Sequence, residues 1–521
     1  MDQNLHVIHS KKGLLGKGVS TGRSDIAAMV AALKADKRKH LVLHFHGGLV
    51  PEQDGFEVAR QLHQTYSPSA DKGGYPIFFV WESGFLETMR DSLGDLVREA
   101  AFAALRDKLL GHLQRKLGIA AFNKSLAGTE AMLEVDSVLA TMPEAERHAL
   151  ADLALPQIDA AELEAELEAD PQLRFILAGL PHAPDGLAGP EKNMPDRREN
   201  WVAEALAREF LAEREPGPEK AHDGWFWTLV EVAWFLAKLA RAVLLRMRSG
   251  RDHGLYATCV EELMRALKLG GQGINEWGKK LQWDQMKETV ENAFGDGPEC
   301  AGTALLRELA AAMQDGESKL ELERITLVGH STGAIYIRHW LAHSAVLGTI
   351  KQDVVFLAPA ITHLEFAALL DTQGERIGSF RLFGMRDEHE RKDQLWGQDN
   401  GELGKLGDQD WRRFLYPASL LYLVSGLLES QAGKGGVRVD APDMPLLGLH
   451  RYLENRQVYP ASAFPSVEKV RVWLGEPGRH VVWSKAVDGK PGFQCDTVDH
   501  GAFDDDTLML DSLRHIVTMG F

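Results

Sequence analysis

The chain has 521 residues, of which 45% are hydrophobic, and a formal net charge of -17. This size and composition predict a globular protein with a large core and room for more than one domain. The negative charge repels phosphate backbones and argues against a nucleic-acid partner. The cysteines, Cys259, Cys300 and Cys495, are too few and too far apart for a disulfide framework or a zinc site, which fits a reducing compartment.

The N-terminal residues carry no sustained apolar run and no small-residue cleavage site. The sequence therefore predicts no secretory signal and a cytoplasmic location, with export by a signal-free route left open.

Short apolar runs bounded by turn residues predict strands at residues 40–45 and 76–82, with a helix at 55–66 between them. This order indicates a βαβ unit and a parallel sheet. Further strands are predicted at residues 323–329, 353–357, 379–385, 467–474 and 480–485, and residues 420–424 fit either a strand or a helix.

Residues 83–319 have an almost entirely helical pattern. We therefore expect an α/β fold in which residues 1–82 and 320–521 form a mostly parallel sheet flanked by helices. Residues 83–319 would form a large helical insertion that resembles a cap or lid, and a second, irregular insertion is expected near residues 388–465.

The most apolar segment covers residues 225–247 and is long enough to span a bilayer. Its charges, Glu231, Lys238, Arg241 and Arg246, fall on one side of a helix, which is typical of an amphipathic helix and costly in a spanning one. The segment is interpreted as a buried helix of the insertion, or as a lid or interfacial helix in contact with a membrane surface.

A nucleophile motif follows the strand at residues 323–329. Residues 329–333 read Gly-His-Ser-Thr-Gly, and a small-residue helix start comes next. Strand, tight turn and helix in this order predict a nucleophile elbow with Ser331 at its tip. The alternative is an ordinary glycine-rich turn with a capping serine.

A second glycine motif, His46-Gly47-Gly48, ends the strand at residues 40–45. The amides of Gly47 and Gly48, together with that of Thr332, are the expected donors of an oxyanion hole. His46 is expected to hold this loop by hydrogen bonding, with His330 as a second supporting residue. The pair His44 and His46 would suit a metal, but further ligands do not follow, so no metal is predicted.

A serine nucleophile needs a histidine base. In enzymes with a nucleophile elbow, that histidine follows the serine in the chain. His500 follows the strand at residues 480–485 and precedes a glycine, as expected for an exposed loop. The rival, His515, lies in a pattern that predicts the closing helix. The acidic run at residues 504–506 suits the N-terminus of that helix, or a cation.

The base needs an orienting carboxylate, which in this arrangement precedes the histidine. Asp387 is the chosen candidate because it directly follows the strand at residues 379–385. Glu388, Asp393 and Glu429 also remain candidates.

Together these motifs resemble the α/β-hydrolase superfamily, especially bacterial lipases and esterases. The resemblance covers residues 38–82 and 320–521, whereas 83–319 match no family, and caps in this superfamily more often enter after a later strand. It implies hydrolysis of carboxylic esters through Ser331, His500 and Asp387, without a cofactor.

The substrate is expected to be a small-molecule or lipid acyl compound. Three tryptophans, Trp225, Trp227 and Trp234, favour a hydrophobic acyl group. The same residues would serve an amidase, a thioesterase or an acyltransferase. A noncatalytic interaction protein on a hydrolase scaffold is the alternative from another class. The sequence does not predict an oligomeric state.

Overall fold

The computed structural model divides the chain into two compact units. Unit 1 contains Met1–Thr88, Gln282–Asp393 and Met444–Phe521, and unit 2 contains Met89–Leu281 and Gln394–Asp443. The structure describes residues 1–16, 18–36, 38–48, 52–69, 72–82, 100–119, 129–178, 229–267, 283–316, 318–393, 405–406, 409–410, 416–429, 431–432, 438–439 and 442–521. Relative to the expected domains, residues 282–319 join the sheet unit and residues 394–443 join the helical one.

Unit 1 contains a seven-stranded sheet in which every neighbouring pair is parallel. The strand order is β1-β3-β2-β4-β5-β6-β11. The strands are β1 Val7–Lys11, β2 His40–Phe45, β3 Tyr75–Glu82, β4 Arg324–His330, β5 Gln352–Leu357, β6 Ile377–Met385 and β11 Arg479–Ser484. The α/β class with a parallel sheet is therefore confirmed.

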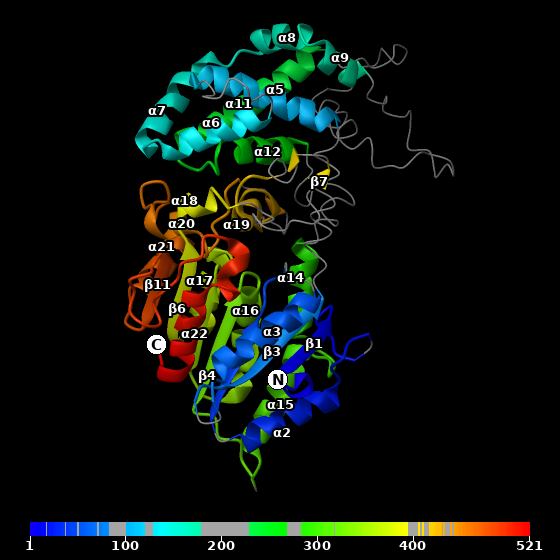
Figure 1. Ribbon diagram of the computed structural model, residues 1–521, viewed down its shortest axis with the longest axis vertical. Helices are drawn as coiled ribbons and strands as arrows, with labels where there is room; N and C mark the ends of the chain where they lie inside the picture. The colour runs from blue at the N-terminus through cyan, green and yellow to red at the C-terminus, as the bar shows by residue number, and fades with distance from the viewer. Residues whose placement is uncertain are drawn as a thin grey trace, which may run out of the picture. The chain divides into compact units, whose positions relative to one another are not determined.

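Helices cover the sheet (Figure 1). All six residues of β2 are buried, as expected for a strand covered on both faces. α3 and α22 pack against each other, and α16 packs against β2, β4 and α17. The helices of unit 1 are α1 Gln3–His6, α2 Arg23–Ala35, α3 Glu52–Tyr66, α14 Trp283–Asn292, α15 Ala301–Gln314, α16 Gly333–His343, α17 His363–Gln373, α18 Asp387–Glu390, α20 His450–Glu454, α21 Pro465–Leu474 and α22 Thr507–Met519, with short 3₁₀ turns η3 Ser344–Leu347, η4 Gly374–Arg376 and η8 His500–Asp504.

The strand order reverses direction between β2 and β4. From β2 the chain proceeds to β3 on one side, and from β4 it proceeds to β5 and β6 on the other. Phe45, the last residue of β2, is paired with Gly329 near the end of β4. Open parallel sheets bind ligands at the carboxyl ends of strands where the order reverses. In this chain the two glycine motifs follow β2 and β4, so both lie at that point.

One predicted strand is wrong: residues 467–474 form helix α21. Pro465 begins the helix, and the buried residues Val467 and Val470 are three apart, whereas Val472 is exposed. Proline at a first turn and a three-residue spacing favour a helix over a strand. The ambiguous residues 420–424 are also helical, because α19 Leu420–Leu423 continues into the π-helical turn η6 Val424–Leu428.

Unit 2 is mainly helical in its described part. Its described helices are α5 Ala100–Leu117, α6 Thr129–Thr141, α7 Glu144–Ala154, α8 Ala160–Glu168, α9 Pro171–Ala178, α11 Leu229–Arg248, α12 Leu255–Ala266 and α19 Leu420–Leu423, with the 3₁₀ turn η1 Leu155–Gln157 and two short antiparallel strand pairs, β7 Lys405–Leu406 with β8 Gln409–Asp410 and β9 Gln431–Ala432 with β10 Arg438–Val439. α11 packs against α7, α8 and α12, so it is the central helix of the bundle (Figure 1).

Helix α11 is the segment expected to be amphipathic. It buries most of its length and exposes Val230, Trp234 and Leu245, of which Trp234 is 54% exposed. Trp225 and Trp227 lie outside the described residues. Within the described ranges, no helix has both the length and the apolar content needed to cross a bilayer.

Candidate active site

Ser331 occupies the sharp turn between β4 and α16. Its φ is 52°, a left-handed conformation that a serine rarely adopts. Two backbone hydrogen bonds fix the turn against the end of β5: the Ser331 amide donates to the Leu357 carbonyl at 2.8 Å, and the Ala360 amide donates to the Ser331 carbonyl at 2.9 Å. Strain maintained in this way by its surroundings is typical of a functional residue.

The glycines on either side of this turn are required by close packing. A Cβ on Gly329 would lie 2.7 Å from the carbonyl carbon of Gly333, and one on Gly333 would lie 2.1 Å from the carbonyl oxygen of Phe45. No side chain fits at these distances. The motif at residues 329–333 therefore brings the end of β4, the start of α16 and the end of β2 into direct contact.

The loop after β2 is held by His46, as expected. Its Nδ1 donates to the Gly47 carbonyl at 2.6 Å, and its Nε2 accepts the Trp81 amide at 3.1 Å. The ring also stacks on the Trp81 indole, with 4.0 Å between the ring centroids. Burial lowers the pKa of His46 to about 4, so the ring is neutral, in agreement with these two bonds.

Gly47 and Gly48 lie directly against the elbow. A Cβ on Gly47 would be 3.3 Å from Ser331 Cβ, and one on Gly48 would be 2.2 Å from Met286 Sδ. The Gly48 amide donates to Thr332 Oγ1 at 2.6 Å. The amides of Gly47 and Thr332 donate to no described residue, so both are available to an oxyanion.

His500 is brought to Ser331. Its Nε2 lies 3.1 Å from Ser331 Oγ, and both side chains are buried. This is the distance required for a base to remove the hydroxyl proton. Burial lowers the pKa of His500 to about 3, and His330 acts in the same direction, so the imidazole is neutral and able to accept a proton.

The rival histidine, His515, lies on α22, the closing helix that the sequence predicts. The acidic residues before that helix have separate roles. Asp506 caps it by accepting the Met509 amide at 2.7 Å, whereas Asp504 is buried beside His330.

The carboxylates of the 387–393 segment have different surroundings. Asp393 Oδ2 accepts the backbone amide of His500 at 3.1 Å, and Asp393 is buried. Asp387 instead pairs with Arg451 Nε at 2.8 Å and with Arg391 Nε at 3.0 Å. The structure therefore brings Asp393, and not Asp387, into contact with His500.

His500 Nδ1 is buried and has no hydrogen-bond partner among the described residues. When Nε2 accepts the Ser331 proton, Nδ1 carries a proton of its own, and an unmade bond from a buried donor costs about 1–3 kcal/mol. Of the two remaining candidate carboxylates, Glu388 has a side chain that is 64% exposed, and Glu429 lies in unit 2.

A possible cation cluster in unit 2 was not anticipated from the sequence. His112, Glu162 and Glu166 offer ligand atoms within 4.8 Å of one another. Arg115 Nη2 already pairs with Glu166 at 2.5 Å, and Lys116 pairs with Glu162. These cations balance the carboxylates, so the cluster is explained as an ion-pair network.

His44, of the His44 and His46 pair considered for a metal, lies inside the core of unit 1. One of its ring nitrogens, Nδ1, is hydrogen-bonded to the Tyr66 hydroxyl at 2.9 Å.

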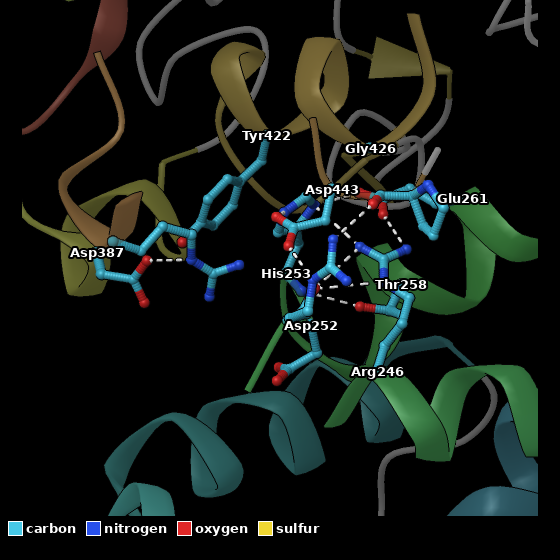
Figure 2. Close-up of polar contacts among 12 residues, drawn as sticks. Arg246, Asp252, His253, Thr258, Glu261, Asp387, Tyr422, Gly426 and Asp443 are labelled. Atoms are coloured by element: carbon cyan, nitrogen blue, oxygen red, sulfur yellow. Dashed lines mark hydrogen bonds and ion pairs between the residues drawn. The ribbon is translucent and has the colours of Figure 1, made fainter. Parts of the chain in front are cut away.

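Unit 2 also contains a buried network of ionisable side chains that no sequence motif predicts (Figure 2). His253 Nδ1 lies 2.8 Å from Glu261, its Nε2 lies 3.3 Å from Asp443, and Arg246 Nη1 lies 2.6 Å from Glu261. The Tyr416 hydroxyl also donates to Glu261. These contacts attach Tyr416 and Asp443 to α12 and to the turn between α11 and α12.

Comparisons of the chain with protein-family models, with curated proteins and with solved structures give no match. The function must therefore be argued from the geometry of the residues around Ser331.

Proposed function

We propose that the chain is a serine hydrolase that cleaves carboxylic esters, with Ser331 as nucleophile and His500 as base. The observation that carries the proposal is the 3.1 Å distance between His500 Nε2 and Ser331 Oγ at a strained strand-to-helix turn. Acyl transfer needs a serine nucleophile, a base within hydrogen-bonding distance of it and available backbone amides for the oxyanion, and these groups lie together here. We also propose that unit 1 has the α/β-hydrolase fold and that residues 83–319 include a cap.

The reaction begins when His500 Nε2 takes the Ser331 proton while Oγ bonds to the substrate carbonyl carbon. The carbonyl π electrons move to its oxygen, which accepts hydrogen bonds from the amides of Thr332 and Gly47; the Gly48 amide, also expected as a donor, is bonded to Thr332 Oγ1. The tetrahedral intermediate then breaks its bond to the alcohol oxygen, and His500 returns the proton to that oxygen. A water molecule, deprotonated by His500, attacks the acyl-enzyme, and Ser331 leaves with the proton restored.

We assign the orienting carboxylate to Asp393 in preference to Asp387. Asp393 already accepts the His500 amide, and His500 Nδ1 is a buried donor in need of an acceptor. A carboxylate that accepts both the His500 amide and the Nδ1 proton fixes the tautomer in which Nε2 is unprotonated and can accept the Ser331 proton. Asp387 is instead committed to two guanidinium groups.

The exposed apolar side chains of the helical insertion favour a hydrophobic substrate. Helix α11 exposes Val230, Trp234 and Leu245, which fits a hydrophobic acyl group or contact with a lipid surface through residues 225–247. Binding to vesicles that is lost when Trp234 and Leu245 are both replaced by serine would support this contact. Equal binding by the double variant and the wild type would contradict it.

The experiment for the proposed function is hydrolysis of p-nitrophenyl esters of increasing acyl length by the wild type, Ser331→Ala and His500→Ala. Both variants should lose turnover, and His515→Ala, as the matched histidine control on α22, should keep it. Full turnover by Ser331→Ala would exclude this serine as the nucleophile.

The same panel separates the other activities that share this machinery. Anilides and thioesters of the preferred acyl group test for an amidase and a thioesterase, and transfer to added alcohols tests for an acyltransferase. Absence of turnover on every acyl compound would favour the noncatalytic interaction protein.

A further inference from the structure

His330 precedes the nucleophile and contacts the loop of the base. Its Nε2 lies 3.0 Å from the backbone carbonyl oxygen of His500. A carbonyl oxygen only accepts, so Nε2 carries a proton and donates it to this bond. Both residues are buried, which makes the bond the direct connection between the elbow and the backbone of the base.

The other ring nitrogen of His330 faces a carboxylate. Its Nδ1 lies 3.7 Å from Asp504 Oδ2, and Asp504 is also buried. A neutral ring with a lone pair on Nδ1 would repel that carboxylate, so the pair favours the imidazolium. Burial lowers the pKa of His330, but Asp504, the His500 carbonyl and Asp499 together outweigh it, and the net shift is upward. For Asp504, burial raises the pKa, but His330, His44 and a backbone hydrogen bond together outweigh it, and the net shift is downward.

We propose that His330 is a positioning residue for His500: it holds the backbone carbonyl of the base through Nε2, and Asp504 holds the ring of His330 through Nδ1. The inference rests on the proposed function, since it concerns the base of that reaction. His330 touches neither Oγ nor the substrate in this role. The distance from His500 Nε2 to Ser331 Oγ then depends on the hydrogen bond between His330 Nε2 and the backbone carbonyl of His500.

Two amide substitutions separate the two contacts of the ring. In His330→Gln the side-chain amide nitrogen reaches about as far as Nε2, so it can still donate to the His500 carbonyl. In His330→Asn the nitrogen reaches only about as far as Nδ1, so it faces Asp504 and leaves the His500 carbonyl without its donor. Neither variant can carry a positive charge at this position, which makes them a matched pair for the position of the donor.

The test measures kcat and KM for the preferred ester, the thermal midpoint, and hydrogen exchange of the amides of residues 496–505, in the full chain. We expect His330→Asn to lower kcat about 10- to 100-fold with KM little changed, because a displaced base costs rate and not binding. His330→Gln should recover most of that kcat, and exchange in residues 496–505 should be faster in His330→Asn than in His330→Gln. His343→Asn, on α16, is the control and should resemble the wild type.

Equal kcat and equal exchange in the two variants would overturn the proposal, as would a loss of kcat that follows the thermal midpoint in both. Failure of the proposed function is distinguishable, because it appears as absence of turnover in the wild type. In that case the exchange data still decide whether the donor at Nε2 holds the 496–505 loop.

Discussion

Replacing Asp393 by asparagine tests which carboxylate orients the base. An asparagine oxygen can still accept the His500 amide, which Asp393 accepts at 3.1 Å, so the loop should keep its place. The negative charge is lost, and the asparagine amide group favours the wrong tautomer of His500. In a serine triad this change lowers kcat on the order of 10⁴-fold, or about 5 kcal/mol.

The matched substitution is Asp387→Asn, on the same charged segment of the chain. Its carboxylate pairs with Arg451 and Arg391, and its own side chain is 29% exposed. We expect a loss of about 1–2 kcal/mol in the free energy of unfolding, because two guanidinium groups lose a partly solvated partner. The kcat should change less than about threefold, since the carboxylate of Asp387 is held by these arginines and not by His500.

The assay is ester turnover under saturating substrate, with urea unfolding of each variant to separate activity from stability. A loss of less than about tenfold in Asp393→Asn, together with a much larger loss in Asp387→Asn, would refute the assignment. It would show that the orienting carboxylate is the one that directly follows β6.

Three further predictions concern the groups around the serine. Gly48→Ala should abolish turnover while the chain still folds, because the new Cβ would lie 2.2 Å from Met286 Sδ and 2.9 Å from Thr332 Oγ1 in the oxyanion loop; steady-state kinetics and circular dichroism check this. Thr332→Val should lower kcat about tenfold and Thr332→Ser should restore it, because only the hydroxyl accepts the Gly48 amide; turnover by both variants decides. Burial lowers the pKa of His500, and the base works only when unprotonated, so the acid limb of kcat/KM should lie below pH 6.5; a limb at or above 6.5 would contradict this.

Local sequence patterns predict the strand-to-helix turn at Ser331 and six of the seven strands of the sheet, but they miss β1 Val7–Lys11. The predicted strands at residues 40–45 and 480–485 agree to within one residue with β2 and β11. In β2, which is buried throughout, the reason is that buried parallel strands are short apolar runs with sharp ends. The segment at residues 467–474 is rich in valine, which favours a strand, but the three-residue spacing of its buried valines belongs to a helix.

The carboxylate could not be chosen from sequence because the choice depends on distant partners. Asp387 and Asp393 belong to one charged run: Asp387 begins the short helix α18, and Asp393 lies just after its end. Arg451, which engages Asp387, is 64 positions away, and His500, which engages Asp393, is 107 positions away. The roles of His330 and Asp504 depend in the same way on contacts across the fold.

The most direct test of the proposed nucleophile is covalent labelling of the intact chain with a fluorophosphonate, followed by mass spectrometry of its peptides. We predict one adduct on Ser331, none in Ser331→Ala, and much slower labelling in His500→Ala, because the base must remove the proton as Oγ attacks phosphorus. Labelling of another residue at the same rate in Ser331→Ala would contradict the assignment. An unlabelled wild type that is shown to be folded would contradict it equally.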